Sequence, residues 1–291
     1  MICTLCPRRC GALRDDAHGE GFCRQPILPV VARAALHRWE EPVISGKNGA
    51  GTVFFSGCSL GCVFCQNEAI SHRDFGKTVS VERLAEIFRE LEAQGAENID
   101  LVNPTHFAHT LPQAIRESGV SIPFVWNSGG YDSVETVRAM APYVSVWLPD
   151  LKYLTPQRAA KYSAAADYPQ VATAALTEMF AQAGPVAVEN GLLKRGVLIR
   201  HLLLPGGLNE AKGVMDWVAA AFPAGSVLFS LMGQYTPYGD LTHCPELNRA
   251  LRPSELRVAA DYMENLGLVG FTQEAAAADA RYIPSFDLTG V

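Results

Sequence analysis

From about residue 50 onward, short apolar runs alternate with longer amphipathic segments. The apolar runs have the length of buried strands and occupy residues 51–56, 98–103, 123–129, 144–152, 197–207 and 226–234. Each run is followed by a segment with helical periodicity or a helix-start signal. Parallel strands joined by helical crossovers produce this alternation, so the pattern predicts an α/β fold: a whole or partial barrel, or a doubly wound sheet.

The clearest predicted helix is SVERLAEIFRELEAQG, residues 80–95. Ser80 suits the N-cap position and Gly95 suits the exit, while the apolar residues between them recur on one helical face. Further helices are predicted at 111–118, from Ser133, from Thr155–Pro156, and at about 168–182, 209–222 and 253–267.

Residues 1–50 do not follow this alternation. We therefore predict three parts: an N-terminal module with a docking segment (1–50), a barrel domain (51–270) and a C-terminal tail (271–291) packed on the outside. The tail is rich in Ala and then in Pro, Ser and Gly, which is typical of a terminal segment without a core of its own.

The composition of the 291 residues narrows the class of protein. Hydrophobic residues make up 48% and charged residues 19%, which suits one large core. The net charge of −6 gives no basic surface for a nucleic acid or an anionic membrane. No secretory h-region and no run of ~20 apolar residues is present, so we expect a cytoplasmic protein. In that reducing compartment the eight cysteines are expected to be metal ligands or reactive thiols.

Polar residues gather where each predicted strand ends. These segments read NPTH (103–106), WNSGGY (126–131), PDLK (149–152), RHLLLPGG (200–207) and GQYTPYG (233–239). Turn chemistry accounts for their Pro and Gly, but not for Asn127, Lys152 or Arg200. In barrels the loops after the strands converge on the active site, so we expect a site at this end.

The first of these loops, GCSLGCVFCQN (57–67), carries Cys58, Cys62 and Cys65 in the spacing C-x3-C-x2-C. No fourth cysteine follows nearby. One interpretation is a zinc knuckle completed by Cys244 or a histidine. Zinc sites usually pair distant C-x2-C units, so a tight C-x3-C-x2-C triplet is unusual for zinc.

This triplet, with Phe64 before its last cysteine, resembles the signature of the radical S-adenosylmethionine (SAM) superfamily. The resemblance implies a 4Fe–4S cluster on Cys58, Cys62 and Cys65, with SAM on the fourth iron. It also implies an oxidoreductase in which the reduced cluster cleaves SAM to a 5′-deoxyadenosyl radical that abstracts hydrogen from a substrate.

More of the chain, from about Gly51 to Leu268, looks like the branch related to pyruvate formate-lyase activating enzymes. That resemblance implies a TIM-barrel-like partial (β/α)6 barrel, and one subgroup of the branch carries a head like CTLCPRRC. The residues that it implies as contacts of the cofactor are Phe64, Asn127, Ser128, Asp150, Lys152 and Arg200.

One segment departs from the superfamily pattern. The second strand usually ends in Gly-Gly-Glu, which receives the amino group of SAM, but here the sequence is Asn103-Pro104-Thr105-His106. Thr105 and the backbone around Pro104 can accept that hydrogen bond, and we expect His106 to orient them. A packed or capping histidine is the alternative.

Four more cysteines, Cys3, Cys6, Cys10 and Cys23, occupy a segment too small to form its own core. This density of thiols predicts a metal site. The C-x2-C pair with two further partners suits zinc, while C-x2-C-x3-C with Pro7 also suits a second iron–sulfur cluster. A structural role is the default.

Three functions follow from these patterns. The first is an activase that removes hydrogen from a glycine of a glycyl-radical enzyme. The second is a radical SAM enzyme acting on a small molecule or another peptide, and the third is a zinc-bound scaffold without catalysis. An electron donor such as flavodoxin or ferredoxin is expected for the first two. The sequence names neither the substrate nor the oligomeric state.

Overall fold

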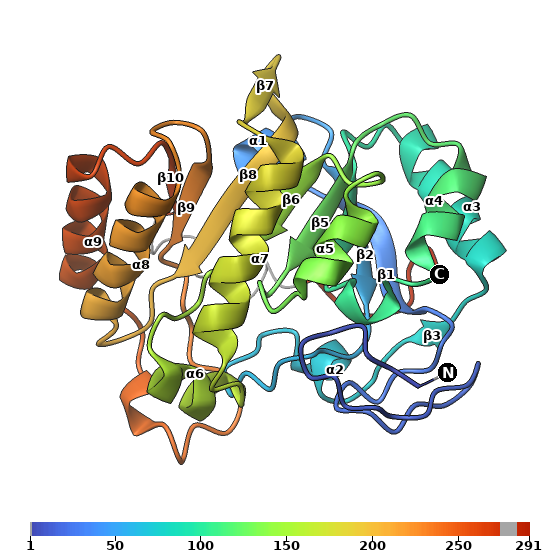
Figure 1. Cartoon of the computed structure of the whole chain (residues 1–291), viewed down its shortest axis with the longest axis horizontal. Helices are drawn as coiled ribbons and strands as arrows, with labels where there is room; N and C mark the ends of the chain where they lie inside the picture. The colour runs from blue at the N-terminus through green and yellow to red at the C-terminus, as the bar shows by residue number, and fades with distance from the viewer. Residues whose placement is uncertain (1, 274–283) are drawn as a thin grey trace.

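The computed structural model describes residues 2–273 and 284–291 (Figure 1). The strands are β1 (Val30–His37), β2 (Ala50–Phe55), β3 (Lys77–Thr78), β4 (Ile99–Val102), β5 (Phe124–Ser128), β6 (Val146–Pro149), β7 (Ala187–Glu189), β8 (Leu192–Leu202), β9 (Leu228–Met232) and β10 (Gly270–Gln273). The α-helices are α1 (Pro42–Ser45), α2 (Glu68–Ser71), α3 (Val81–Ala93), α4 (Leu111–Ser118), α5 (Val134–Met140), α6 (Pro156–Ser163), α7 (Tyr168–Ala183), α8 (Leu208–Ala221) and α9 (Pro253–Asn265). None of these helices is long and apolar enough to cross a membrane.

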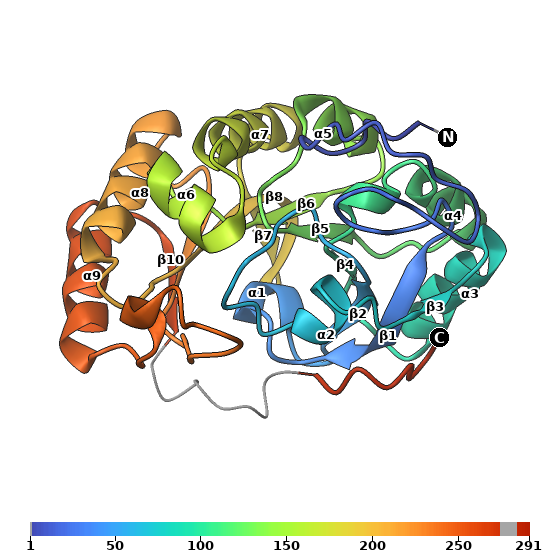
Figure 2. The same ribbon diagram turned by 90° about the horizontal axis from the view of Figure 1, so that it is seen from below.

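In the described part of the chain the strands form one sheet in the order β10-β9-β8-β6-β5-β4-β2-β1-β3, with β7 paired to β8. Every neighbouring pair from β2 to β10 is parallel. The long helices lie along the outer face of the curved sheet (Figure 2), and the sheet is not closed, because β10 and β3 are its two edges. The partial barrel is therefore confirmed, and the doubly wound alternative is wrong.

All six predicted strands and the predicted helices are present. Ser80 caps α3 by accepting a hydrogen bond from the backbone N–H of Arg83 at 3.1 Å, as its position predicts. The sequence analysis missed β10. Its apolar run is short, and most of it falls within the predicted tail, 271–291.

Two boundaries need correction. Residues 30–37, which were assigned to the N-terminal module, form β1 and pair with β2 of the main sheet. Residues 270–273 extend the sheet beside β9, because their backbone continues its hydrogen-bonding pattern. Of the predicted tail, residues 284–291 pack on β1, where Ala34 donates a hydrogen bond to Thr289 O at 2.8 Å. Residues 274–283 lie outside the described residues.

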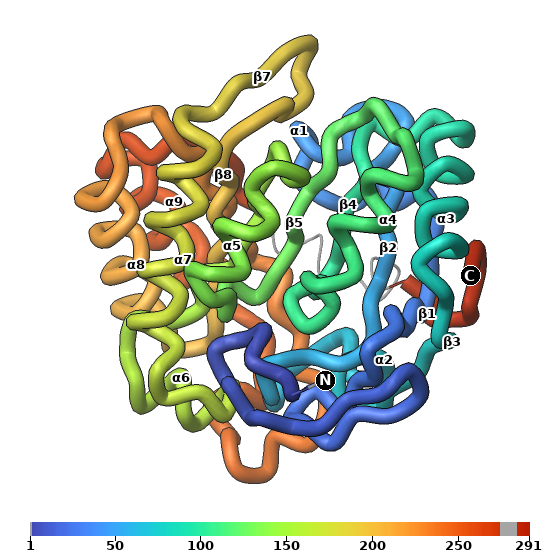
Figure 3. The backbone as a smooth tube through the Cα atoms, turned by 45° about the vertical axis from the view of Figure 1, so that its right-hand side comes forward, coloured from blue at the N-terminus to red at the C-terminus, as the bar shows by residue number. Residues whose placement is uncertain are grey.

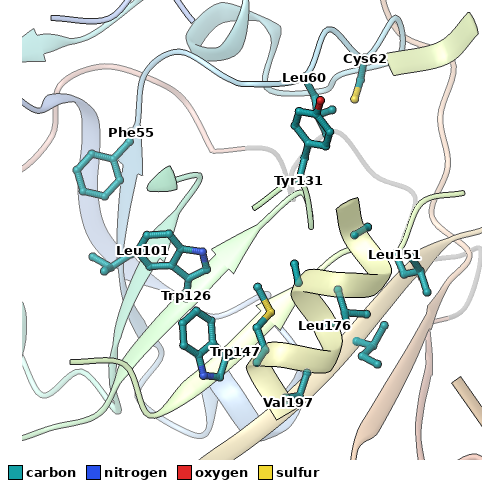
Figure 4. Packing of buried hydrophobic residues seen from close by; sticks show 14 of the residues in the cluster. Phe55, Leu60, Cys62, Leu101, Trp126, Tyr131, Trp147, Leu151, Leu176 and Val197 are labelled. Atoms are coloured by element: carbon teal, nitrogen blue, oxygen red, sulfur yellow. The ribbon is translucent and has the colours of Figure 1, made fainter. Parts of the chain in front are cut away.

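The two faces of the sheet bury different groups. Outward-facing side chains of the strands, such as Trp126 and Trp147, pack against Leu176 and the rest of α7 (Figure 4). Inward-facing residues form a smaller apolar cluster with Ile44 of α1, including Val125. This cluster fills the barrel near the beginnings of the strands, so the other end is left to polar groups.

Residues 2–29 cover the end of the barrel at which the parallel strands finish. In Figures 1 and 3 this segment runs beside α2, which follows the cysteine loop. Its regular structure is limited to isolated bridges, Ile2 with Leu13 and Arg14 with Gly19. The N-terminal cysteines and the barrel cysteines are therefore neighbours in space.

Candidate active site

The three-cysteine loop leaves β2 at the carboxyl end of the sheet. Each sulfur lies within hydrogen-bond distance of one polar group: Leu60 N at 3.3 Å from Cys58, Ser163 Oγ at 3.0 Å from Cys62, and Ser71 Oγ at 3.2 Å from Cys65. These partners come from the loop itself, α6 and α2. The barrel and its helices thus hold the loop in place.

The electrostatics of the loop suit a metal-bound state. Burial and, second to it, the neighbouring Cys62 raise the pKa of Cys58 to about 12 and that of Cys65 to about 11. Three thiolates at this spacing repel one another in a buried place, and iron supplies the positive charge that offsets the repulsion. The donor set therefore fits a 4Fe–4S cluster.

Within residues 2–273 and 284–291, no three His, Cys, Asp or Glu side chains are grouped around a single ion position. In an iron–sulfur cube each cysteine binds a different iron, so its ligands do not converge on one point. The cysteines are free thiols in the structure. For Cys3, Cys6, Cys10 and Cys23, the metal site stays a prediction.

A cavity of about 200 Å³ opens beside the loop. Its walls come from the cysteine loop, the end of β6 and the segment after β9, and they include Cys62, Phe64, Cys65, Asp150, Lys152 and Tyr235. The structure therefore brings three of the predicted cofactor contacts together with two of the predicted cluster ligands.

Asp150 links the cavity to the barrel interior. It accepts hydrogen bonds from Lys152 Nζ at 2.6 Å and from Arg200 Nε at 2.9 Å. Although burial raises the pKa of the Asp150 carboxyl, the two cations lower it more, so it stays ionised. Burial likewise lowers the pKa of Lys152, but Asp150 raises it more, so Lys152 remains a cation on the cavity wall.

Arg200 is fully engaged by its neighbours. Besides Asp150, its guanidinium donates to Asn127 Oδ1 at 2.6 Å and to Glu40 Oε2 at 3.0 Å. All three guanidinium nitrogens therefore have a protein acceptor. Arg200 organises the floor of the site, while Lys152 is the basic group that faces the cavity.

Sequence reasoning missed three acidic residues of this buried layer. Glu40 and Glu41 directly precede α1, and Asp100 lies in β4, where it accepts from Asn127 Nδ2 at 3.2 Å. Burial, and to a lesser extent the neighbouring Glu40, raises the pKa of Asp100 well above its usual range, although Arg200 and Asn127 lower it. A lone Asp at an inward-facing position of the apolar run NIDLVN was the signal that could have revealed it.

The segment after β4 lies against the start of the cysteine loop. Asn103 adopts a φ of +58° and donates from Nδ2 to Gly57 O, while its Oδ1 lies 3.6 Å from Cys58 Sγ. His106 is buried, and its Nε2 lies 2.6 Å from Ser56 O. Burial lowers the pKa of His106 to about 3, so this histidine is neutral and packed beneath the loop.

A fourth buried acid, Asp132, gathers two of the predicted contact residues. Thr105 donates to Asp132 Oδ1 at 2.6 Å, and Ser128 donates to Asp132 Oδ2 at 2.5 Å. Trp126 Nε1 also donates to Asp132 Oδ1, at 3.3 Å. The hydroxyl protons of Thr105 and Ser128 thus point to Asp132, so the two oxygens act as acceptors, and Ser128 Oγ already accepts from Gly130 N–H at 3.2 Å. Their contact with the amino group of SAM stays a prediction.

Comparisons with known proteins agree with this site. A family model described as a 4Fe-4S single cluster domain matches residues 44–146, which include the cysteine loop. The protein MJ0674 of Methanocaldococcus jannaschii is 27% identical over 278 residues, covering 91% of this chain and 75% of its own.

Among solved structures, Streptococcus suis SuiB bound to the precursor peptide SuiA has a TM-score of 0.53 at 13% identity, covering 75% of this chain. The chain spans about half of SuiB (47%). A domain of a pyruvate-formate lyase-activating enzyme from Bacteroides vulgatus has a TM-score of 0.40 at 14% identity, covering 67% of this chain and 91% of that domain. This TM-score is too low to show the same fold. The chain therefore shares the fold of SuiB over 75% of its length, and residues 44–146 are similar to a 4Fe–4S single cluster domain.

Proposed function

We propose that this protein is a radical SAM enzyme. One observation carries the proposal: the three-cysteine loop, Asp150 and Lys152 line the same cavity at the carboxyl end of a partial barrel. The 4Fe–4S match over residues 44–146 supports the cluster at this loop.

Cys58, Cys62 and Cys65 would hold the cluster, which when bound supplies the electron that cleaves SAM and generates a hydrogen-abstracting radical. The residues around it bind and orient. Ser163 Oγ lies 3.0 Å from Cys62 Sγ and Ser71 Oγ lies 3.2 Å from Cys65 Sγ. Phe64 packs edge-on against Tyr235, with 5.9 Å between the ring centres, and both rings line the cavity.

Lys152 is placed to bind the carboxylate of SAM. Lys152 lines the cavity, and its ammonium donates to Asp150 Oδ2 at 2.6 Å, which leaves further N–H donors for an anion. Asp150 fixes the ammonium, and Arg200 with Asn127 fixes Asp150. A displaced Asp150 would misplace Lys152, which makes Arg200 a positioning residue.

For the substrate, we propose first a glycine in a partner protein, as the sequence resemblance to activating enzymes implies. SuiB, whose fold is similar, was solved with a bound precursor peptide, which agrees with a peptide substrate. A small molecule is the second candidate, because Asn103-Pro104-Thr105-His106 replaces Gly-Gly-Glu and a cysteine module is added. A flavodoxin or ferredoxin would supply the electron.

The test is anaerobic purification followed by incubation with SAM and a reductant. We expect the visible absorbance of an iron–sulfur cluster and the release of 5′-deoxyadenosine. A deuterated peptide or small molecule is then added, and only the true substrate transfers deuterium into 5′-deoxyadenosine. A protein that contains zinc alone and leaves SAM intact would refute the proposal.

We also propose that Cys3, Cys6, Cys10 and Cys23 bind one metal centre, either zinc or a second iron–sulfur cluster. Burial raises the pKa of Cys6 to about 11, and Cys23, Cys3 and Cys10 each raise it further, which supports a shared site. Metal analysis with Mössbauer spectra of the wild type and of a C3S/C6S/C10S variant distinguishes the two metals. Equal metal content in both proteins would contradict a site here.

A further inference from the structure

Arg8 connects the two groups of cysteines. Its side-chain Nε donates to Ser59 O at 2.9 Å, and Ser59 directly follows Cys58 in the cluster loop. Arg8 itself belongs to the N-terminal module, between Cys6 and Cys10. One residue of the module thus contacts the three-cysteine loop.

Aromatic rings hold the Arg8 side chain in place. Its guanidinium carbon lies 3.9 Å from the ring centre of Phe22 and 5.4 Å from that of Tyr131. The Tyr131 hydroxyl is anchored by donation to Asp167, and Figure 4 shows Tyr131 beside Leu60 of the loop. A planar guanidinium between two rings loses little further freedom, so its charge has a defined position.

The N-terminal segment packs closely against two glycines of the loop, Gly57 and Gly61. Gly57 has a φ of +80°, and a Cβ there would lie 2.8 Å from Cys23 O and 2.3 Å from Gln25 Cγ. A Cβ at Gly61 would touch Phe22 at 3.4 Å. The contact between Arg8 and the loop is therefore part of a continuous interface.

One nitrogen of Arg8 lacks an acceptor. Nη2 is buried and has no hydrogen-bond partner among the described residues. An arginine stays charged, and a buried N–H group without an acceptor is costly, so such a group suits a neighbouring anion. The thiolates and sulfides of an iron–sulfur cluster in this loop carry negative charge that increases on reduction.

We propose that Arg8 is a positioning residue that sets the reduction potential of the cluster on Cys58, Cys62 and Cys65. Its fixed positive charge stabilises the reduced, more negative cluster and raises the potential, so that a flavodoxin- or ferredoxin-type donor can deliver the electron. This inference rests on the proposed function only in requiring a cluster at the loop.

The experiment compares R8Q, R8K and R9Q with the wild type. Arg9 is the matched control, because its guanidinium is exposed and pairs with Glu135 at the surface. The EPR signal that disappears in a C58S/C62S/C65S variant is followed in a redox titration. We expect R8Q to shift the midpoint to a more negative potential, R8K to retain part of the wild-type value, and R9Q to leave it unchanged.

An R8Q protein with normal iron content and an unchanged midpoint would overturn the inference. Equal loss of iron in R8Q, R8K and R9Q would also overturn it, since that result indicates general destabilisation. A wild-type signal that does not respond to SAM contradicts the proposed function but leaves the test of Arg8 intact. A wild type without a cluster at the loop overturns both.

Discussion

The two cysteine groups lie side by side but are held in different ways. In the three-cysteine loop the sulfurs contact Ser163 of α6 and Ser71 of α2, so packed helices fix them. In the N-terminal segment, turns hold the cysteines: Arg9 N–H donates to Cys6 O at 3.0 Å, and Arg24 N–H donates to Gly21 O at 2.9 Å.

The difference extends to burial. The loop contributes Leu60, Cys62 and Phe64 to the main core, whereas the N-terminal segment exposes Ile2, Leu13 and Phe22. The first site is therefore formed by the barrel and can accept a labile cofactor. The second lacks an apolar core, so we expect its fold to depend on the bound metal.

The largest effect is expected from C58S/C62S/C65S. Loss of the cluster ligands should reduce SAM cleavage below detection, while the barrel remains folded because helices and strands surround the loop. SAM cleavage and thermal unfolding are the measurements. Cys244→Ser is the control, since Cys244 belongs to neither group, and it should keep its iron. A triple variant that fails to fold would show that the barrel does not hold the loop by itself.

A chelator, or replacement of all four N-terminal cysteines by Ser, should release the N-terminal segment. Structural metal sites supply roughly 10 kcal/mol of folding free energy, and this segment has no apolar core of its own to replace it. Limited proteolysis should then cut within residues 2–29, while circular dichroism of the barrel stays unchanged. Continued protection of the segment would mean that docking alone stabilises it.

Arg200→Met tests the polar layer, the buried group that Arg200 forms with Asp150, Asn127 and Glu40. Removing one partner of a buried ion pair costs about 3–5 kcal/mol, because Glu40 loses its cation and Asp150 keeps only Lys152. Urea unfolding measures the cost. Arg138→Met is the matched control, since its pair with Glu178 lies at the surface and should cost less than about 1 kcal/mol. Equal costs would indicate that the polar layer contributes no special stability.

Glu41→Gln should alter the pH dependence of stability. Burial raises the pKa of Glu41, Arg200 lowers it and Glu40 raises it, so that it lies at about 7 instead of the usual 4.5. Between these values the folded state binds a proton that the unfolded state has lost, so stability falls as pH rises from about 4.5 to 7. Glutamine does not ionise and should remove this fall, which is on the order of 2 kcal/mol. Unfolding free energies from pH 4 to 8 would measure it, and parallel curves for both proteins would contradict it.

Much of the architecture could be predicted because strand and helix periods are local. The runs at 51–56 and 226–234 became β2 and β9 within a few residues, and Ser80 caps α3. Strand β10 and the pairing of β1 with β2 could not be predicted, since both depend on which strand edges are free after the sheet has formed.

The sequence alone determined which residues can bind iron, because thiol chemistry and the spacing of Cys58, Cys62 and Cys65 are properties of the chain. It also determined that polar residues follow the strands. Only the tertiary structure decided that Arg200 is engaged by Glu40, Asn127 and Asp150, that Lys152 faces the cavity, and that Arg8 reaches Ser59. These contacts join residues far apart in sequence, and their strength comes from burial, which no local pattern encodes.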